Sequence, residues 1–180
     1  MKLLALILTL TAAACAHDLE DNRATLVLRD PTHISVTLYL NYPEALHKLL
    51  LPQREYGAFL LIYSSMKPEE LKKELLRAQA KFEADTQLST PAGARLKLSG
   101  WLWPDTKQVQ TILQQQVMQA MVDGHVHSPP IEIHADALAS TSIQTITAQF
   151  PAEFQKVLVV SYKPNQVWIG GSDPQPRIHF

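Results

Sequence analysis

Strand-like alternation occupies both ends of the sequence and helical periodicity fills the middle, and this order restricts the fold class most. Residues 23–29 and 33–40 alternate apolar and polar side chains around an Asp30-Pro31 turn, which predicts a β-hairpin. Strand-like stretches return near the C-terminus, at residues 131–135, 143–150, 156–162 and 166–169. This order is typical of an α+β domain in which an N-terminal hairpin pairs with C-terminal strands.

Helical periodicity predicts about three helices between these strands. Apolar residues recur at helical spacing over residues 42–51, 68–85 and 106–123. Residues 54–66 are broadly apolar and fit either a buried helix or a strand; we favour a helix because Ser64, Ser65 and Pro68 then form a natural break. A further strand is expected at residues 96–103, before Pro104.

We therefore predict an α+β fold with an antiparallel or sandwich-like β core, built from the hairpin and the C-terminal strands, with about three helices inserted. Val157 to Val160 lack polar alternation, so we expect them in the middle of the sheet. The predicted division is a signal peptide at residues 1–16, one domain at 17–170 and a loose tail at 171–180.

The first 16 residues are typical of a secretory signal peptide. Met1-Lys2 gives a positive start, residues 3–10 are apolar, and Thr11 to Ala14 are small. This apolar stretch is too short to span a membrane as a helix. We therefore expect export to the cell envelope of a bacterium, as a periplasmic or secreted protein.

Three processing outcomes remain open. Cleavage after Ala16 would leave His17 as the first residue. Residues 12–15 also resemble a lipobox, which would place a lipid anchor on Cys15 and tether the protein to the outer membrane. Cleavage just before Cys15 would leave a free thiol. Cys15 is the only cysteine, so no internal disulfide forms in any of these cases.

Charge and motif content narrow the function classes. Sixteen Lys and Arg against 17 Asp and Glu give a net charge of -1, so no strong field exists to attract nucleic acid or anionic lipid. The chain has no nucleophile elbow, no zinc-protease motif and no glycine-rich phosphate loop. We therefore predict that the protein is not an enzyme.

Histidines and carboxylates gather in one short stretch of the sequence. Asp123, His125, His127, Glu132, His134 and Asp136 fall within 14 residues. On an extended backbone, residues two apart share a face, and imidazole and carboxylate groups suit copper, nickel or zinc. The alternative is that residues 131–135 simply place apolar side chains inside and polar side chains outside.

The mature N-terminus offers a second possible metal ligand. If His17 comes first, its amine and imidazole would chelate Cu(II), which resembles the N-terminal-histidine copper proteins at this single residue. A third ligand would have to come from His33, His125, His127 or His134. Lipidation at Cys15 would block the amine and remove this site.

Trp101 and Trp103 lie two residues apart on a predicted strand and therefore share a face. Such a pair forms either a stacking platform for sugar or peptide or an ordinary packing contact at the rim of the core.

The export signal, the His17-Asp18 start, the hairpin ATLVLRDPTHISVTLYL and the closing VLVVSYKPNQVWI together resemble small uncharacterised exported bacterial proteins. They also distantly resemble the exported domain that precedes the membrane part of hydrogenase and urease accessory (nickel-permease-like) proteins. The resemblance covers about a third of the chain and implies an envelope location, a β-rich non-catalytic domain and a role in metal supply.

From these observations we expect an exported binding or accessory domain without a cofactor, whose partner is another envelope protein. Nucleic acid is excluded as a partner, and membrane contact is expected only through lipid on Cys15. The alternative is a periplasmic protein that handles copper, nickel or zinc through His17 or the cluster of His125, His127 and His134.

Overall fold

The computed structural model describes residues 22–123 and 130–165, and it confirms the α+β fold class. The N-terminal hairpin forms as expected from β1 (Asn22–Asp30) and β2 (His33–Leu40), which pair antiparallel from Asn22↔Leu40 onwards. Asp30 closes the turn because its carboxylate accepts a hydrogen bond from the amide of Thr32 at 2.8 Å.

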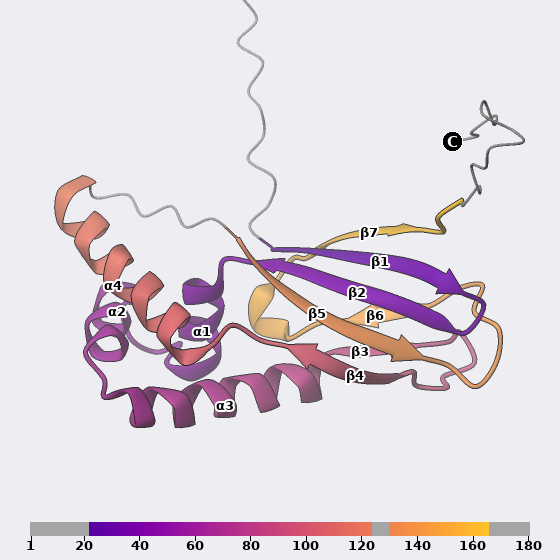
Figure 1. Cartoon of the computed structure of the whole chain (residues 1–180), viewed down its shortest axis with the longest axis horizontal. Helices are drawn as coiled ribbons and strands as arrows, with labels where there is room; N and C mark the ends of the chain where they lie inside the picture. The colour runs from indigo at the N-terminus through magenta and orange to yellow at the C-terminus, as the bar shows by residue number, and fades with distance from the viewer. Residues whose placement is uncertain (1–21, 124–129, 166–180) are drawn as a thin grey trace, which may run out of the picture.

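The main sheet has the strand order β4-β5-β2-β1-β7 (Figure 1). Its remaining strands are β4 (Lys97–Leu102), β5 (Ile131–Leu138) and β7 (Leu158–Tyr162). The expectation of an antiparallel sheet needs a correction, because β7 runs parallel to β1. After β5, the chain returns along the sheet through β6 (Thr147–Gln149) and η1 (Ala152–Phe154), so β7 starts at the same end as β1.

One face of the sheet forms the floor of the core. Ile34, Val36, Leu38 and Leu40 of β2 are all at most 3% exposed. Ile133, Ala135 and Ala137 continue this buried face on β5. The alternating polar residues of both strands lie on the opposite, outer face.

Four helices are found in the described part of the chain: α1 (Tyr42–Leu50), α2 (Tyr56–Ser64), α3 (Pro68–Asp85) and α4 (Thr106–Asp123). The helix favoured for residues 54–66 is confirmed at residues 56–64, and with it the described residues hold four helices where about three were predicted. Phe59, Leu60 and Tyr63 of α2 are buried, and the Tyr56 hydroxyl donates a hydrogen bond to the buried Gln116 of α4. Tertiary packing against α4 therefore selects helix over strand for this apolar stretch.

The apolar stripe predicted for residues 68–85 is confirmed. Leu71, Leu75, Ala78 and Phe82 are the buried residues of α3. Phe82, at the end of the stripe, packs α3 against three other aromatic rings. The centroid of its ring lies 5.9, 5.4 and 5.6 Å from those of Trp101, Trp103 and Phe154.

The strand predicted at residues 143–150 is mostly wrong. Only Thr147–Gln149 forms a strand, and it pairs with the three-residue β3 (Gln87–Ser89). Ile143 is buried in a loop, and its backbone amide donates a hydrogen bond to the carbonyl of Pro31 at 2.6 Å. Its apolar character therefore reflects burial under the hairpin turn rather than strand pairing.

The central position expected for Val157 to Val160 is also wrong. β7 is the outermost strand of the sheet among the described residues, and its residues are exposed. Leu158, Val159 and Val160 retain 40%, 42% and 40% of their surface. The cause is strand order: of the strands that the structure describes, β7 pairs with β1 alone, so an apolar run does not by itself imply two neighbouring strands.

The signal peptide, the tail and the strand predicted at residues 166–169 lie outside the described residues. None of the described helices combines the length and the apolar character that crossing a membrane requires.

Candidate functional site

Of the four predicted metal ligands, the described structure contains His134; His17, His125 and His127 lie outside the described residues. His134 points to the outer face of the sheet and is about half exposed, at 46%. Its Nδ1 lies 3.3 Å from the Thr37 hydroxyl, and its Nε2 lies 3.5 Å from Glu132. The side chains of Glu132 and His134 border a hollow of about 500 Å³ between β5 and α4.

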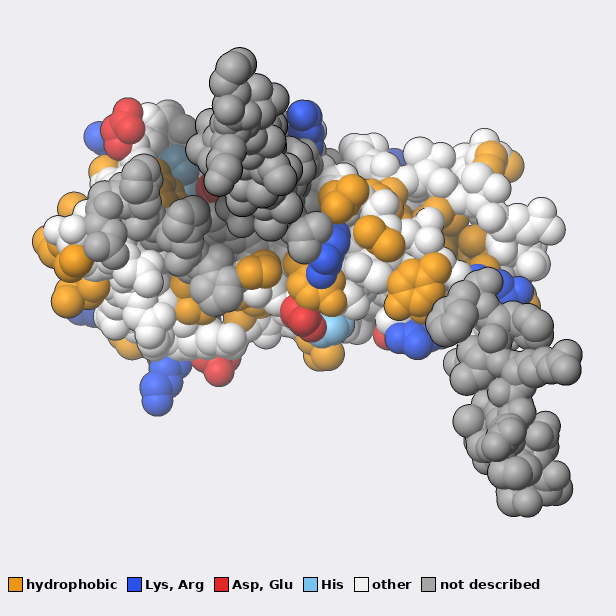
Figure 2. Space-filling model, turned by 90° about the horizontal axis from the view of Figure 1, so that it is seen from above, with side chains coloured by type: hydrophobic (Ala, Val, Ile, Leu, Met, Phe, Trp, Pro, Cys, Tyr) orange, Lys and Arg blue, Asp and Glu red, His pale blue; other side chains and the backbone are white. Residues whose placement is uncertain are grey.

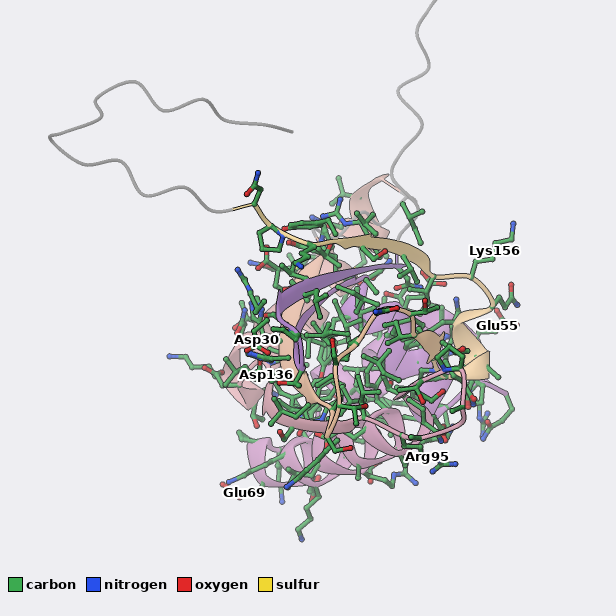
Figure 3. All side chains as sticks on the ribbon, turned by 90° about the vertical axis from the view of Figure 1, so that its right-hand side faces the viewer. Asp30, Glu55, Glu69, Arg95, Asp136 and Lys156 are labelled. Carbon is green, nitrogen blue, oxygen red and sulfur yellow. The ribbon has the colours of Figure 1, made fainter. Side chains whose placement is uncertain are left out.

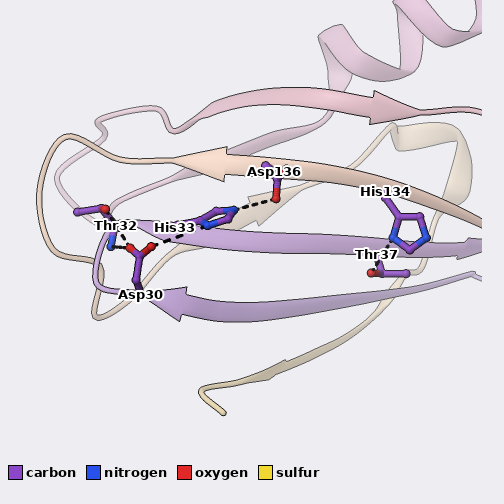
Figure 4. Close-up of polar contacts among 6 residues, drawn as sticks. All are labelled: Asp30, Thr32, His33, Thr37, His134 and Asp136. Carbon is purple, nitrogen blue, oxygen red and sulfur yellow. Dashed lines mark hydrogen bonds and ion pairs between the residues drawn. The ribbon is translucent and has the colours of Figure 1, made fainter. Parts of the chain in front are cut away.

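A second histidine on this face makes the stronger polar contact (Figure 4). The Nε2 of His33 donates a hydrogen bond to Asp136 at 2.8 Å, which ties the hairpin to β5. Its Nδ1 lies 3.9 Å from Asp30, and both aspartates lie at the same end of the fold (Figure 3). The hydrogen bond from the Thr32 amide lowers the pKa of Asp30, with the Thr32 hydroxyl and His33 adding to this effect.

The two histidine contacts do not form one site. His134 lies opposite Thr37, four residues along β2 from His33. At about 3.3 Å per residue, this separates them by roughly 13 Å along the strand. Within residues 22–123 and 130–165, no group of three or more His, Cys, Asp or Glu side chains has a metal-binding arrangement.

The first residues of β1 and β5 nevertheless lie at the same end of the sheet, which is the end of β5 that carries His134. Asn22, the first residue of β1, lies opposite Leu40, which in turn lies opposite Ile131, the first residue of β5. His17 precedes Asn22 by five residues, and His127 precedes Ile131 by four. Asn22 and Ile131 themselves therefore lie at the end of the sheet where Glu132 and His134 lie.

Trp101 and Trp103 share a face as expected, and they pack rather than form an open platform. Their rings stack at 5.6 Å with an interplanar angle of 17°, and both meet the edge or face of Phe82. The indole nitrogen of Trp103 donates to Glu83 at 2.8 Å, so its polar group is already bonded to α3.

The most unusual surface of the described chain is the free side of β7. All five residues of this strand are exposed, and Tyr162 retains 53% of its surface. Figure 2 looks down on the molecule from the β7 side and shows apolar side chains gathered there. The five residues of β7 include no charged residue and no proline, which are two of the features that natural proteins use to protect a sheet edge.

The opposite edge of the sheet differs in its backbone. β4 has an irregular register between Ser99 and Leu102, where Gly100 adopts a positive φ of 67°. Such a bulge bends the strand and disturbs the row of backbone groups that another strand would need. Of the two edges of the main sheet in the described structure, β7 is therefore the one suited to regular strand pairing.

An apolar groove adjoins this edge on the inner face of the sheet. It encloses about 360 Å³ between the sheet and the loop before β6. Its apolar lining comes from Leu26, Leu28 and Ile34 of the hairpin and from Ile143 and Ile146 of the loop. Ser161 and Lys163 border it on the β7 side.

Sequence reasoning missed this site because it placed residues 157–160 inside the sheet. The available signal was the uncharged run Val157 to Tyr162 between Lys156 and Lys163, since flanking lysines are typical of an exposed strand. Comparison with protein-family models, curated proteins and solved structures found no match to the chain.

Proposed function

We propose that this chain is an exported cell-envelope binding domain, without catalytic activity, that holds a protein partner by strand addition to β7. The observation that carries this proposal is the free edge of β7, with its exposed apolar residues on both faces of the sheet. Envelope location rests on the signal-like N-terminus and on the resemblance to exported bacterial domains.

Strand addition suits this edge for two physical reasons. Alternate backbone N–H and C=O groups of β7 point away from β1 and would bond to an added strand. An added strand would also cover Leu158, Val160 and Tyr162, whose apolar surface now faces water. Together, main-chain bonding and apolar burial supply both the geometry and the free energy for binding an extended segment.

The test is site-specific photo-cross-linking in the native host. A photoreactive amino acid replaces Val160 on β7 or, as the matched control, Leu102 on the bulged edge, which is 63% exposed. We expect a discrete protein adduct from position 160 and none from position 102. Equal adducts at both positions, or no adduct at position 160, would contradict the proposal.

Metal handling is the second candidate function, favoured by the common sheet end of Asn22 and Ile131. It predicts stoichiometric binding of Cu(II), Ni(II) or Zn(II) by the mature protein, lost in His17→Ala or His134→Ala. His47→Ala is the control, because His47 lies on α1 and bonds the carbonyl of Arg54. Metal binding that survives both changes, or no stoichiometric binding, would remove this candidate.

A further inference from the structure

We infer that the segment bound at β7 is an extended peptide with one apolar anchor side chain and acidic residues at its two ends. This inference rests on the proposed strand addition and names the chemistry of the partner. It is carried by two features beside β7: the apolar groove on the inner face and a lysine just outside each end of the strand.

The groove lies where an added strand would place a side chain. Ser161 of β7 lies opposite Leu26 of β1, and both border the groove. In a strand pair, residues directly opposite each other point to the same face. The residue of the peptide that lies opposite Ser161 would therefore face Leu28 and Ile143, which fit a leucine or similar side chain.

Lys156 and Lys163 supply the charge selectivity. Both are exposed, and neither forms an ion pair with the described residues. Lys156 extends away from the body of the fold (Figure 3), while Lys163 borders the groove itself. Carboxylates at the two ends of a bound strand would lie within reach of both ammonium groups.

The charged groups of the neighbouring strand add to this preference. β1 contributes the exposed Arg29, whereas the half-buried Arg23 lies over the ring of Tyr39 at 4.2 Å, on β2 and away from β7. The one carboxylate of β1, Asp30, already accepts hydrogen bonds from Thr32. The exposed cationic groups beside this apolar strand are therefore Lys156, Lys163 and Arg29.

The same charges disfavour a second copy of the chain as the occupant. If two β7 strands paired antiparallel around Val160, Lys163 of one copy would lie one residue position from Lys156 of the other. This juxtaposition would occur at both ends of the paired strands, and like charges across a strand pair destabilise it. A separate acidic segment avoids this repulsion.

The test uses a nine-residue synthetic peptide with aspartate at both ends, alternating threonine and valine, and a central leucine. Its binding to the purified mature protein is measured by fluorescence anisotropy. Replacing both aspartates by lysine, or the central leucine by serine, is expected to weaken binding about tenfold. Methylating alternate backbone nitrogens is expected to abolish it.

A charge exchange in the protein completes the test. The double change Lys156→Glu and Lys163→Glu is expected to reverse the preference, so that the lysine-ended peptide binds more tightly than the aspartate-ended one. Lys73→Glu is the matched control, because Lys73 is exposed on α3 and distant in sequence from β7, and it should leave the preference unchanged.

The outcomes separate this inference from the proposed function. If all unmethylated peptides bind equally and methylation abolishes binding, strand addition stands and the acidic, leucine-anchored partner is overturned. If no peptide binds, the inference is overturned as well. The photo-cross-linking result at position 160 then decides, independently, whether β7 holds a partner at all.

Discussion

The carboxylate of Asp136 lies 3.5 Å from the position that a Cβ atom would occupy on Gly100. This is an ordinary van der Waals distance, so space alone does not require glycine at position 100. The requirement comes from the backbone, because Gly100 has a φ of 67° at the irregularity of β4. The bulge and the Asp136–His33 hydrogen bond therefore meet at one point on the outer face.

Gly100→Ala is expected to destabilise the fold by about 1–2 kcal/mol, because a Cβ disfavours a positive φ. The matched control is Gly57→Ala in α2, where φ is not positive and no atom lies within 4 Å of the new Cβ. That change should stabilise the fold by about 0.4–1 kcal/mol. Urea unfolding measures both values, and equal effects from the two changes would contradict this account.

Phe82→Ala should be among the most damaging single changes. The ring is 1% exposed and contacts Trp101, Trp103 and Phe154, so we expect a loss of about 3–5 kcal/mol. Tryptophan fluorescence should shift to longer wavelength, because water gains access to both indoles. Leu76→Ala, at a side chain that is 55% exposed on the same helix, should change neither measurement appreciably.

Tyr42 gives the fold a dependence on alkaline pH. Burial raises the pKa of Tyr42 to about 12 from its ordinary value of 10.0. Below pH 10 the contribution of the protonated Tyr42 to the free energy of unfolding is fully present. Between pH 10 and about 12 this tyrosine loses its proton in the unfolded chain and keeps it in the folded chain, so stability falls as pH rises. Tyr42→Phe should reduce this fall, as measured by urea unfolding from pH 9 to 12, while Tyr162→Phe at an exposed ring should not.

The ion pair of Lys81 with Glu153 makes the stability of the fold depend on acidic pH. The hydrogen bond from Lys81 lowers the pKa of Glu153, so this stabilisation is present above the ordinary pKa of 4.5 and is lost as pH falls through the lower folded value. The pair is partly exposed, so Glu153→Gln should cost at most about 1 kcal/mol at pH 7 and flatten the acid dependence. Lys73→Met, which removes an exposed lysine of the same helix, should leave that dependence unchanged; an equal flattening would argue against the pair.

The processing of the N-terminus is tested by intact mass spectrometry of the protein from soluble and membrane fractions. The mass of a chain that starts at an unmodified His17 would be consistent with the N-terminal metal site. A lipid on Cys15 would exclude that site and place the protein on a membrane through its anchor. A protein that still begins at Met1 in both fractions would contradict cleavage of a signal peptide and hence export.

Local periodicity was sufficient to predict those elements whose pattern is complete within a few turns or residues. The stripe Leu71, Leu75, Ala78 and Phe82 predicts α3 with its observed bounds, and the alternation of residues 33–40 predicts β2 and its buried face. In both cases one face is buried and the other is solvated, so the sequence period reports the geometry directly.

Within the candidate site, sequence reasoning found His134 and its shared face with Glu132 and Asp136, because side chains two apart on a strand must agree in direction. It gave no sign that His33 would bond Asp136, since these residues are 103 positions apart. Their contact exists because β2 and β5 are neighbours in the sheet, which no local pattern specifies.

The sequence alone thus determined the α+β class, the hairpin, the long helices and the alternation that separates core from surface. The tertiary structure decided which strand lies at the edge. Val157 to Val160 have the composition of a central strand, yet within residues 22–123 and 130–165 β7 pairs with β1 alone. Strand order depends on long-range pairing and on the route of the connecting chain, and these leave no periodic trace in the residues of the strand itself.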